Sequence, residues 1–139
     1  MGGSFVQLKK TDYTALAKFR SSLRRFLHET SEAARKNGVT PQQHQVMLSI
    51  KGTQGRNWLS VGELADSMQV RHHSMVALVD RCQRAGLVQR ARGTSDRRVA
   101  RVSLTPKGEK LIEQLSFENK QELNRLRTAL QMHFGEDSK

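Results

Sequence analysis

The chain has 139 residues, a length that suits one compact domain with extensions. It carries 24 lysines and arginines against 13 acidic residues, a net charge of +11, and one cysteine, which excludes an intrachain disulfide and a cysteine-based zinc cluster. No apolar run approaches the roughly 18 residues that cross a bilayer, and no signal-peptide core follows the N-terminus, so we expect a cytoplasmic protein with no membrane partner.

The first part of the chain predicts two helices. Apolar residues recur at helical spacing over 12–36, and the pattern stops at Gly38. A second helix is expected to begin at Thr40, because proline follows the threonine and Gln43 completes a capping box. This helix should end before Gly52, ahead of a short edge strand.

Residues 60–86 predict a helix-turn-helix. Ser60 and Glu63 have capping-box spacing, and apolar residues follow at helical intervals. After a break of three residues the apolar stripe resumes and runs to a stop at Gly86, through Met75, Leu78, Val79 and Cys82. Two short helices joined by so few residues are typical of a helix-turn-helix.

The second of these helices is expected to expose a polar face. At about 100° per residue, the apolar stripe leaves the opposite side to His72, His73, Ser74, Ala77, Arg81 and Arg84. Small and hydrogen-bonding side chains at a helix N-terminus fit the major groove of a DNA duplex.

A β-hairpin should follow, with arms at 87–92 and 97–104 around a turn that contains Gly93, Ser95 and Asp96. Its outer part has a single acid, Asp96, and five arginines: Arg90, Arg92, Arg97, Arg98 and Arg101. This one-signed surface indicates an anionic partner. Only one aromatic residue, Trp58, lies between 40 and 108, so a row of rings for stacking unpaired bases is missing and duplex binding is favoured.

A long final helix is expected over 106–134, where Thr105 and Pro106 give a cap and a proline start. At 1.5 Å per residue it would be about 43 Å long, longer than the preceding module can cover. The helix over 12–36 has a similar excess of apolar surface. We therefore expect both to pack against their copies in a second subunit. Asn119 falls within the apolar stripe, as either an exposed residue or a register-setting contact.

These motifs resemble the winged helix-turn-helix of the MarR (multiple antibiotic resistance regulator) family. The resemblance rests on the segments VRHHS (70–74), LVDR (78–81), GLV (86–88), DRR (96–98) and LTPKG (104–108), and it extends over about 12–134. It implies a mainly α fold with a small β-hairpin wing (α+β), a single MarR-like domain over 1–139, a DNA-binding module at 40–108 and dimerisation helices at 12–36 and 106–134.

The resemblance further implies a homodimeric repressor that binds a pseudo-palindromic duplex and responds to a small aromatic or phenolic effector. In the family, the acid of the wing motif steadies an arginine in the minor groove, which corresponds to Asp96 and Arg98. The expected DNA contacts are Arg71, His72, His73, Ser74, Ala77, Arg81, Arg92, Asp96, Arg97 and Arg98. Arg71 stands where the family often has a capping side chain, so a phosphate contact could compensate its charge.

Other interpretations remain open. His28 and Glu32 share a helix face and His44 lies on the next helix, so a metal-responsive regulator is one alternative. A winged-helix adaptor for an acidic protein is another. Cys82 lies on the apolar stripe, where a core residue is favoured over a redox sensor. The chain has no enzyme signature: it lacks a phosphate-binding glycine loop, HExxH and G-x-S-x-G.

Overall fold

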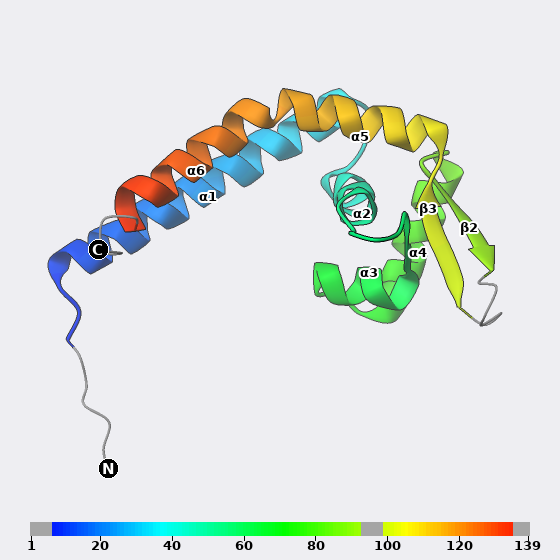
Figure 1. The fold of residues 1–139 in the computed structure, drawn as a ribbon, viewed down its shortest axis with the longest axis horizontal. Helices are drawn as coiled ribbons and strands as arrows, with labels where there is room; N and C mark the ends of the chain where they lie inside the picture. The colour runs from blue at the N-terminus through cyan, green and yellow to red at the C-terminus, as the bar shows by residue number, and fades with distance from the viewer. Residues whose placement is uncertain (1–6, 93–98, 135–139) are drawn as a thin grey trace, which may run out of the picture. The chain divides into compact units, whose positions relative to one another are not determined.

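The computed structural model describes residues 7–92 and 99–134, which form helices and a small sheet (Figure 1). In chain order the elements are α1 (Lys10–Lys36), α2 (Pro41–Lys51), β1 (Trp58–Ser60), α3 (Val61–Met68), α4 (His72–Arg84), β2 (Val88–Arg92), β3 (Ala100–Leu104), α5 (Pro106–Glu118) and α6 (Lys120–Phe134). The predicted mainly α fold with a small antiparallel sheet is therefore confirmed. Among the described residues, no helix is long and apolar enough to cross a membrane.

The chain divides into two compact units. One comprises residues 31–118, from the end of α1 to the end of α5, and holds the sheet and the short helices. The other comprises residues 1–30 and 119–139, so its described part is most of α1 together with α6. Each unit is described below by itself.

The capping boxes predicted at α2 and α3 are present. The Thr40 hydroxyl accepts a hydrogen bond from the Gln43 N–H at 3.1 Å, and the Gln43 side chain accepts one from the Thr40 N–H at 3.0 Å. Ser60 and Glu63 make the equivalent pair at 3.1 and 3.0 Å. Each box satisfies two N–H groups that a helix leaves without partners, and the second box fixes the start of α3 directly after β1.

The turn of the helix-turn-helix depends on one left-handed residue. Gln69 has φ of +57°, and the Val70 N–H then reaches back to the Ala65 carbonyl at 3.0 Å. Gly86 ends α4 in the same way with φ of +76°, and there the Leu87 N–H donates to the Cys82 carbonyl at 2.9 Å. Both stops have the pattern of the Schellman motif, which satisfies carbonyl groups at a helix end.

The strands form an antiparallel sheet in the order β1-β3-β2. Val102 of β3 lies opposite Leu59 of β1 and Arg90 of β2. Because facing residues of an antiparallel pair point to the same side, one side of the sheet is mostly apolar, with Arg90 and Arg92 among its residues, and the other carries Trp58 and polar side chains. The apolar side joins the core of this unit, whose fully buried residues include Met47, Ile50, Leu64, Met75, Val79, Leu87, Val88, Val102, Ile112 and Leu115.

The LTPKG segment joins α5 to the end of α4. The Thr105 hydroxyl donates to the Gly86 carbonyl at 2.5 Å and accepts from the Gly108 N–H at 3.1 Å. The Lys107 ammonium donates to the Ala85 carbonyl at 2.9 Å. A Cβ placed on Gly108 would lie 2.1 Å from the Leu87 carbonyl oxygen, so this position admits only glycine without backbone movement.

The prediction of one continuous helix over 106–134 is wrong. The segment forms two helices, α5 and α6, which are separated at Asn119. The Asn119 carbonyl accepts the Leu123 N–H at 3.0 Å, so the asparagine stands at the start of α6. Asparagine is a poor residue inside a helix and a favoured one at a helix start, which accounts for the break. Asn119 is half-buried.

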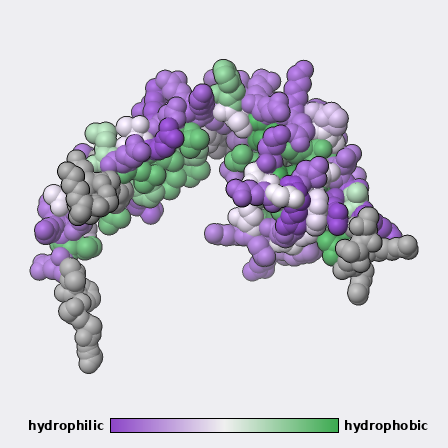
Figure 2. Space-filling view, viewed as in Figure 1, coloured by the Kyte–Doolittle hydropathy of each residue, from purple (hydrophilic) through white to green (hydrophobic). Residues whose placement is uncertain are grey.

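The second unit has little internal core. In its described part, Thr30 is the only residue that is buried. An ion pair of 4.0 Å between Arg25 and Glu122 links α1 to α6. Figure 2 shows hydrophobic side chains gathered over this unit, and its exposed apolar residues are Leu8, Tyr13, Leu16, Leu27, Leu123, Leu130 and Met132.

Candidate nucleic-acid interface

The outer face of α4 has the composition that the sequence predicts. Met75, Leu78, Val79 and Cys82 are buried in the core. The opposite face exposes His72, His73, Ser74, Ala77, Arg81 and Arg84 to solvent. The one acid of α4, Asp80, lies on the same side beside Ala77 and Arg84. It is paired with Arg90 at 2.8 Å, so its charge is offset where a phosphate backbone would approach.

Arg71 precedes α4 as its N-cap residue. Its backbone is extended, with φ of −70° and ψ of 151°, and its side chain makes no capping hydrogen bond. The first N–H groups of α4 are therefore not capped by this side chain. A helix N-terminus with free N–H groups attracts anions, and the exposed Arg71 adds a positive charge beside it.

The described arginines of the hairpin have different surroundings. Arg92 is exposed on β2. Arg90 is held against α4, because its guanidinium pairs with Asp80 at 2.8 Å and donates to the Gln83 side chain at 2.7 Å. Arg90 is therefore a link between the hairpin and α4 rather than a free cation. Asp96, Arg97 and Arg98 lie outside the described residues.

A cluster around Trp58 was not predicted from the sequence. The guanidinium of Arg56 lies 4.3 Å from the centre of the Trp58 ring, and that of Arg101 lies 4.2 Å from it. Both guanidinium groups therefore lie within cation–π distance of the same ring. Cation–π contacts of this kind hold the arginines in place. We call Arg56, Trp58 and Arg101 the arginine–tryptophan stack.

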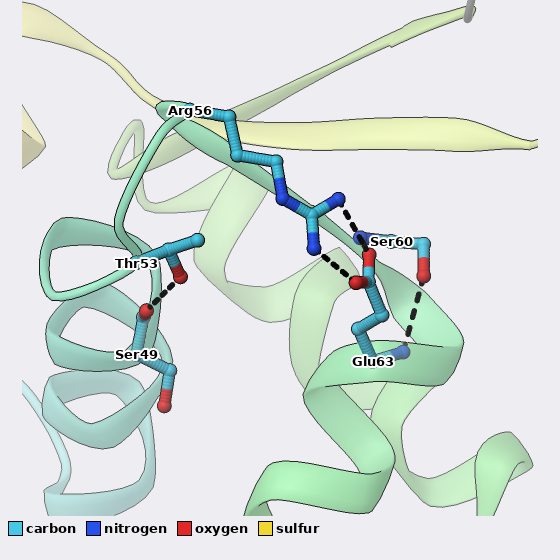
Figure 3. A network of polar contacts seen from close by, with 5 residues as sticks. All are labelled: Ser49, Thr53, Arg56, Ser60 and Glu63. Atoms are coloured by element: carbon cyan, nitrogen blue, oxygen red, sulfur yellow. Dashed lines mark hydrogen bonds and ion pairs between the residues drawn. The ribbon is translucent and has the colours of Figure 1, made fainter.

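The stack is tied to the start of α3 through Glu63 (Figure 3). Both carboxylate oxygens of Glu63 accept hydrogen bonds from Arg56, one of them at 3.1 Å. Together with the bond from the Ser60 N–H, this arginine lowers the pKa of Glu63 to about 2. Glu63 is therefore ionised at neutral pH and balances the charge of Arg56.

The candidate metal ligands have other roles or surroundings. Glu32 pairs with Arg35 at 2.8 Å, His28 is exposed, and His44 is buried in the core of its unit. Within residues 7–92 and 99–134, no three histidine, cysteine or acidic side chains are grouped so that they could hold a metal ion.

Cys82 is a core residue, as predicted. Its side chain is fully buried, and burial raises the pKa of its thiol to about 11. The reactive thiolate is therefore rare at neutral pH, which disfavours a redox sensor at this position.

A helix-turn-helix followed by a β-hairpin that is linked back to its second helix defines a winged helix-turn-helix. A sequence model of the MarR family matches residues 37–99. The chain is 36% identical over 87 residues to the HTH-type transcriptional repressor MdtR of Bacillus subtilis, which covers 63% of this chain and 54% of that relative. The chain thus spans about half the length of this curated relative.

Solved structures agree with these matches. A MarR family protein from Bacillus stearothermophilus has a TM-score of 0.72 and 28% identity, over 84% of this chain and 80% of that one. A mutant of S. aureus MepR bound to an oligodeoxyribonucleotide has the same fold, with a TM-score of 0.66 and 19% identity over 90% of this chain and 84% of that chain. Residues 37–99 of the chain therefore match the MarR family. This family consists of non-enzymatic regulators, in agreement with the prediction that the chain is not an enzyme.

Proposed function

We propose that the chain is a cytoplasmic transcription regulator that binds double-stranded DNA in a sequence-specific manner and acts as a repressor. The observation that carries this proposal is the outer face of α4, where histidine, serine and arginine side chains are exposed and the one acid, Asp80, is paired with Arg90. In this proposal α4 enters the major groove, and Arg71 and Arg92 contact phosphates on either side. The similarity to a named repressor and to a regulator solved with DNA supports it.

Selection of bound duplexes from a random pool tests this function. A common motif should emerge, and a duplex of that motif should bind more tightly than a scrambled one at the same salt concentration. Affinity should also fall steeply as salt rises, because bound phosphates release their counterions. A winged-helix adaptor for an acidic protein would show no such selectivity, so the pool would remain random.

We propose further that the protein acts as a homodimer on a pseudo-palindromic operator. The support is the unit formed by α6 and most of α1, which exposes seven large apolar side chains and buries almost none of its own. A two-fold dimer would cover these residues and would present two copies of α4 to inverted half-sites. A small aromatic or phenolic effector is expected from the family resemblance, and screening such compounds for release of the selected duplex tests it.

The wing contact rests on the sequence motif, since its residues lie outside the described ones. Arg98→Ala should weaken binding of the selected duplex by about 1–3 kcal/mol per subunit, as expected when a minor-groove guanidinium is lost. Asp96→Ala should weaken specific binding as well, although it makes the protein more positive, because Arg98 loses the acid that orients it. Tighter binding of every duplex by Asp96→Ala would show that only the charge of the wing matters.

A further inference from the structure

We propose that Arg101 forms a phosphate-binding site on the solvent-facing side of the sheet, where Trp58 holds its guanidinium ready for the backbone of a bound duplex. The site is separate from the outer face of α4. It depends on the proposed function, because it assigns a second, sequence-independent contact to the same DNA complex.

The two arginines of the arginine–tryptophan stack differ in how their charges are balanced. Arg56 is paired with Glu63, which is ionised at neutral pH. Arg101 has no such partner, since no carboxylate in the described part of the chain lies within ion-pair distance of it. The stack therefore carries one positive charge that the protein does not balance, and this charge is on Arg101.

The surroundings of Arg101 favour an anion. On β3 it lies opposite Ser60 of β1 and Ala91 of β2, on the side of the sheet that faces away from the core. Its neighbours on this side include Ser103 and Gln89, which are paired with each other and can donate hydrogen bonds. The described strand residues on this side include no acid.

Trp58 lowers the entropic cost of binding at Arg101. A free arginine side chain loses rotamer entropy when it is fixed. Arg101 is already half-buried and lies over the ring, so much of this cost is met when the protein folds. When the central carbon of a guanidinium lies over a ring, the N–H groups at the edge of the guanidinium stay available. These groups can donate hydrogen bonds to a phosphate oxygen.

The stack also disfavours a single-stranded base as the ligand. A single-stranded base would bind by stacking on an aromatic ring. Two guanidinium groups already contact the Trp58 ring, so less of the ring is open to a base. The positive charge of Arg101 suits a phosphate group better than a base, and contact with a phosphate should strengthen binding of every duplex equally.

The test measures affinity for the selected duplex and for a scrambled duplex over a range of salt concentrations. Arg101→Gln should lower the salt slope by about one unit and weaken both complexes by a similar factor of roughly 2 to 10. Lys110→Gln is the matched control: it removes one charge from an exposed position on α5 and should leave the slope unchanged. Arg101→Lys keeps the charge and loses the planar guanidinium. This variant should therefore bind both duplexes more weakly than the wild type, with the same salt slope.

Trp58 provides a second readout because it is the only tryptophan of the chain. Its fluorescence should change when wild-type protein binds either duplex, and the change should be smaller in Arg101→Gln. Inorganic phosphate at matched ionic strength should not reproduce it. If inorganic phosphate reproduces the change equally in wild-type protein and in Arg101→Gln, the fluorescence does not report on Arg101 and the phosphate site is refuted.

The two proposals fail in different ways. Absence of duplex binding by the wild-type protein would refute the proposed function. Duplex binding with a wild-type salt slope in Arg101→Gln, or with unchanged Trp58 fluorescence, would refute the phosphate site alone. If Arg101→Gln does not fold, the affinity of Arg101→Lys and the Trp58 fluorescence of the wild-type protein test the phosphate site instead. Wild-type affinity in Arg101→Lys would then contradict the proposal.

Discussion

Gly108 lies against the backbone of Leu87, at the point where α5 follows the sheet. An alanine Cβ there would approach the Leu87 carbonyl oxygen to 2.1 Å, and the atom it meets is backbone that cannot rotate away. We expect Gly108→Ala to lower the free energy of unfolding by about 3 kcal/mol, the upper part of the usual range for overpacking. Denaturant unfolding with circular dichroism would measure this.

Gly62→Ala is the control for Gly108→Ala. Gly62 lies inside α3, and an added Cβ would come no closer than 3.9 Å to the Ser60 hydroxyl. Since alanine is the better helix former by about 1 kcal/mol, this variant should be slightly more stable than the wild type. Equal stability of the two variants would mean that the backbone at Leu87 can move aside.

His44 gives the fold a dependence on pH. Its side chain is 6% exposed, and burial lowers its pKa below the usual 6.5. Below about pH 6.5 the unfolded chain therefore binds a proton at His44 that the folded chain does not bind. Stability from this group is fully present above pH 6.5 and is lost as the pH falls, by at most about 1.4 kcal/mol per pH unit. Urea unfolding between pH 5 and 8 would show the slope.

A pair of variants isolates the contribution of His44. His44→Gln should reduce the pH dependence of the free energy of unfolding, whatever its effect on stability at pH 8. His28→Gln, at an exposed position, should leave the dependence unchanged. A wild-type slope in His44→Gln would assign the effect to another group.

At the level of elements, α4 and β2 are linked through Arg90. The ion pair with Asp80 and the hydrogen bond to Gln83 hold β2 against α4. Because both partners are partly exposed, a double-mutant cycle of Arg90→Ala and Asp80→Ala should give a coupling energy of only about 0.2–1 kcal/mol in stability. In DNA binding we expect a larger loss for Arg90→Ala, because wing and helix must reach adjacent grooves together. Equal losses in stability and affinity would argue against a positioning role.

Local signals explain why most elements could be predicted from the sequence. The capping boxes at Thr40 and Ser60, and the glycine stop at Gly86, act within a few residues, so their spacing in the chain is sufficient evidence. The apolar stripe of α4 likewise predicted which side chains are buried. The break at Asn119 was missed because the apolar pattern continues across it, although asparagine is itself a local signal against a continuous helix.

The arginine–tryptophan stack could not be predicted in the same way. Trp58 and Arg101 are far apart in the sequence and meet only because β1 pairs with β3 in one register, in which Trp58 lies opposite Ser103. A shift by one residue would place Arg101 on the other side of the sheet. Long-range pairing of this kind leaves no pattern in a single sequence.

The charge of the whole molecule is unevenly distributed between its two units. In the described residues 7–30 and 119–134 there are nine lysines and arginines against three acids, a denser positive charge than in the winged-helix unit. This is the unit that we propose to dimerise. Its two copies would repel one another, whereas the winged-helix units would be attracted to DNA. Salt should therefore have opposite effects on the two associations, strengthening the dimer and weakening the DNA complex.

The dimer can be tested on α6, where Leu123 is 55% exposed and apolar. Leu123→Lys should shift the mass in sedimentation equilibrium from dimer to monomer at micromolar concentration, because a charge would be buried in the interface and would add to the repulsion. Gln121→Lys adds the same charge two residues away, about 200° around the helix, and should remain dimeric.

On DNA the wild-type protein should require inverted half-sites about 10 base pairs apart, centre to centre, and lose affinity when five base pairs are inserted between them. The Leu123→Lys variant should bind a single half-site and the full site with the same affinity per subunit. A wild-type protein that is monomeric both free and on DNA would end the dimer proposal, and it would leave the apolar faces of α1 and α6 to some other partner.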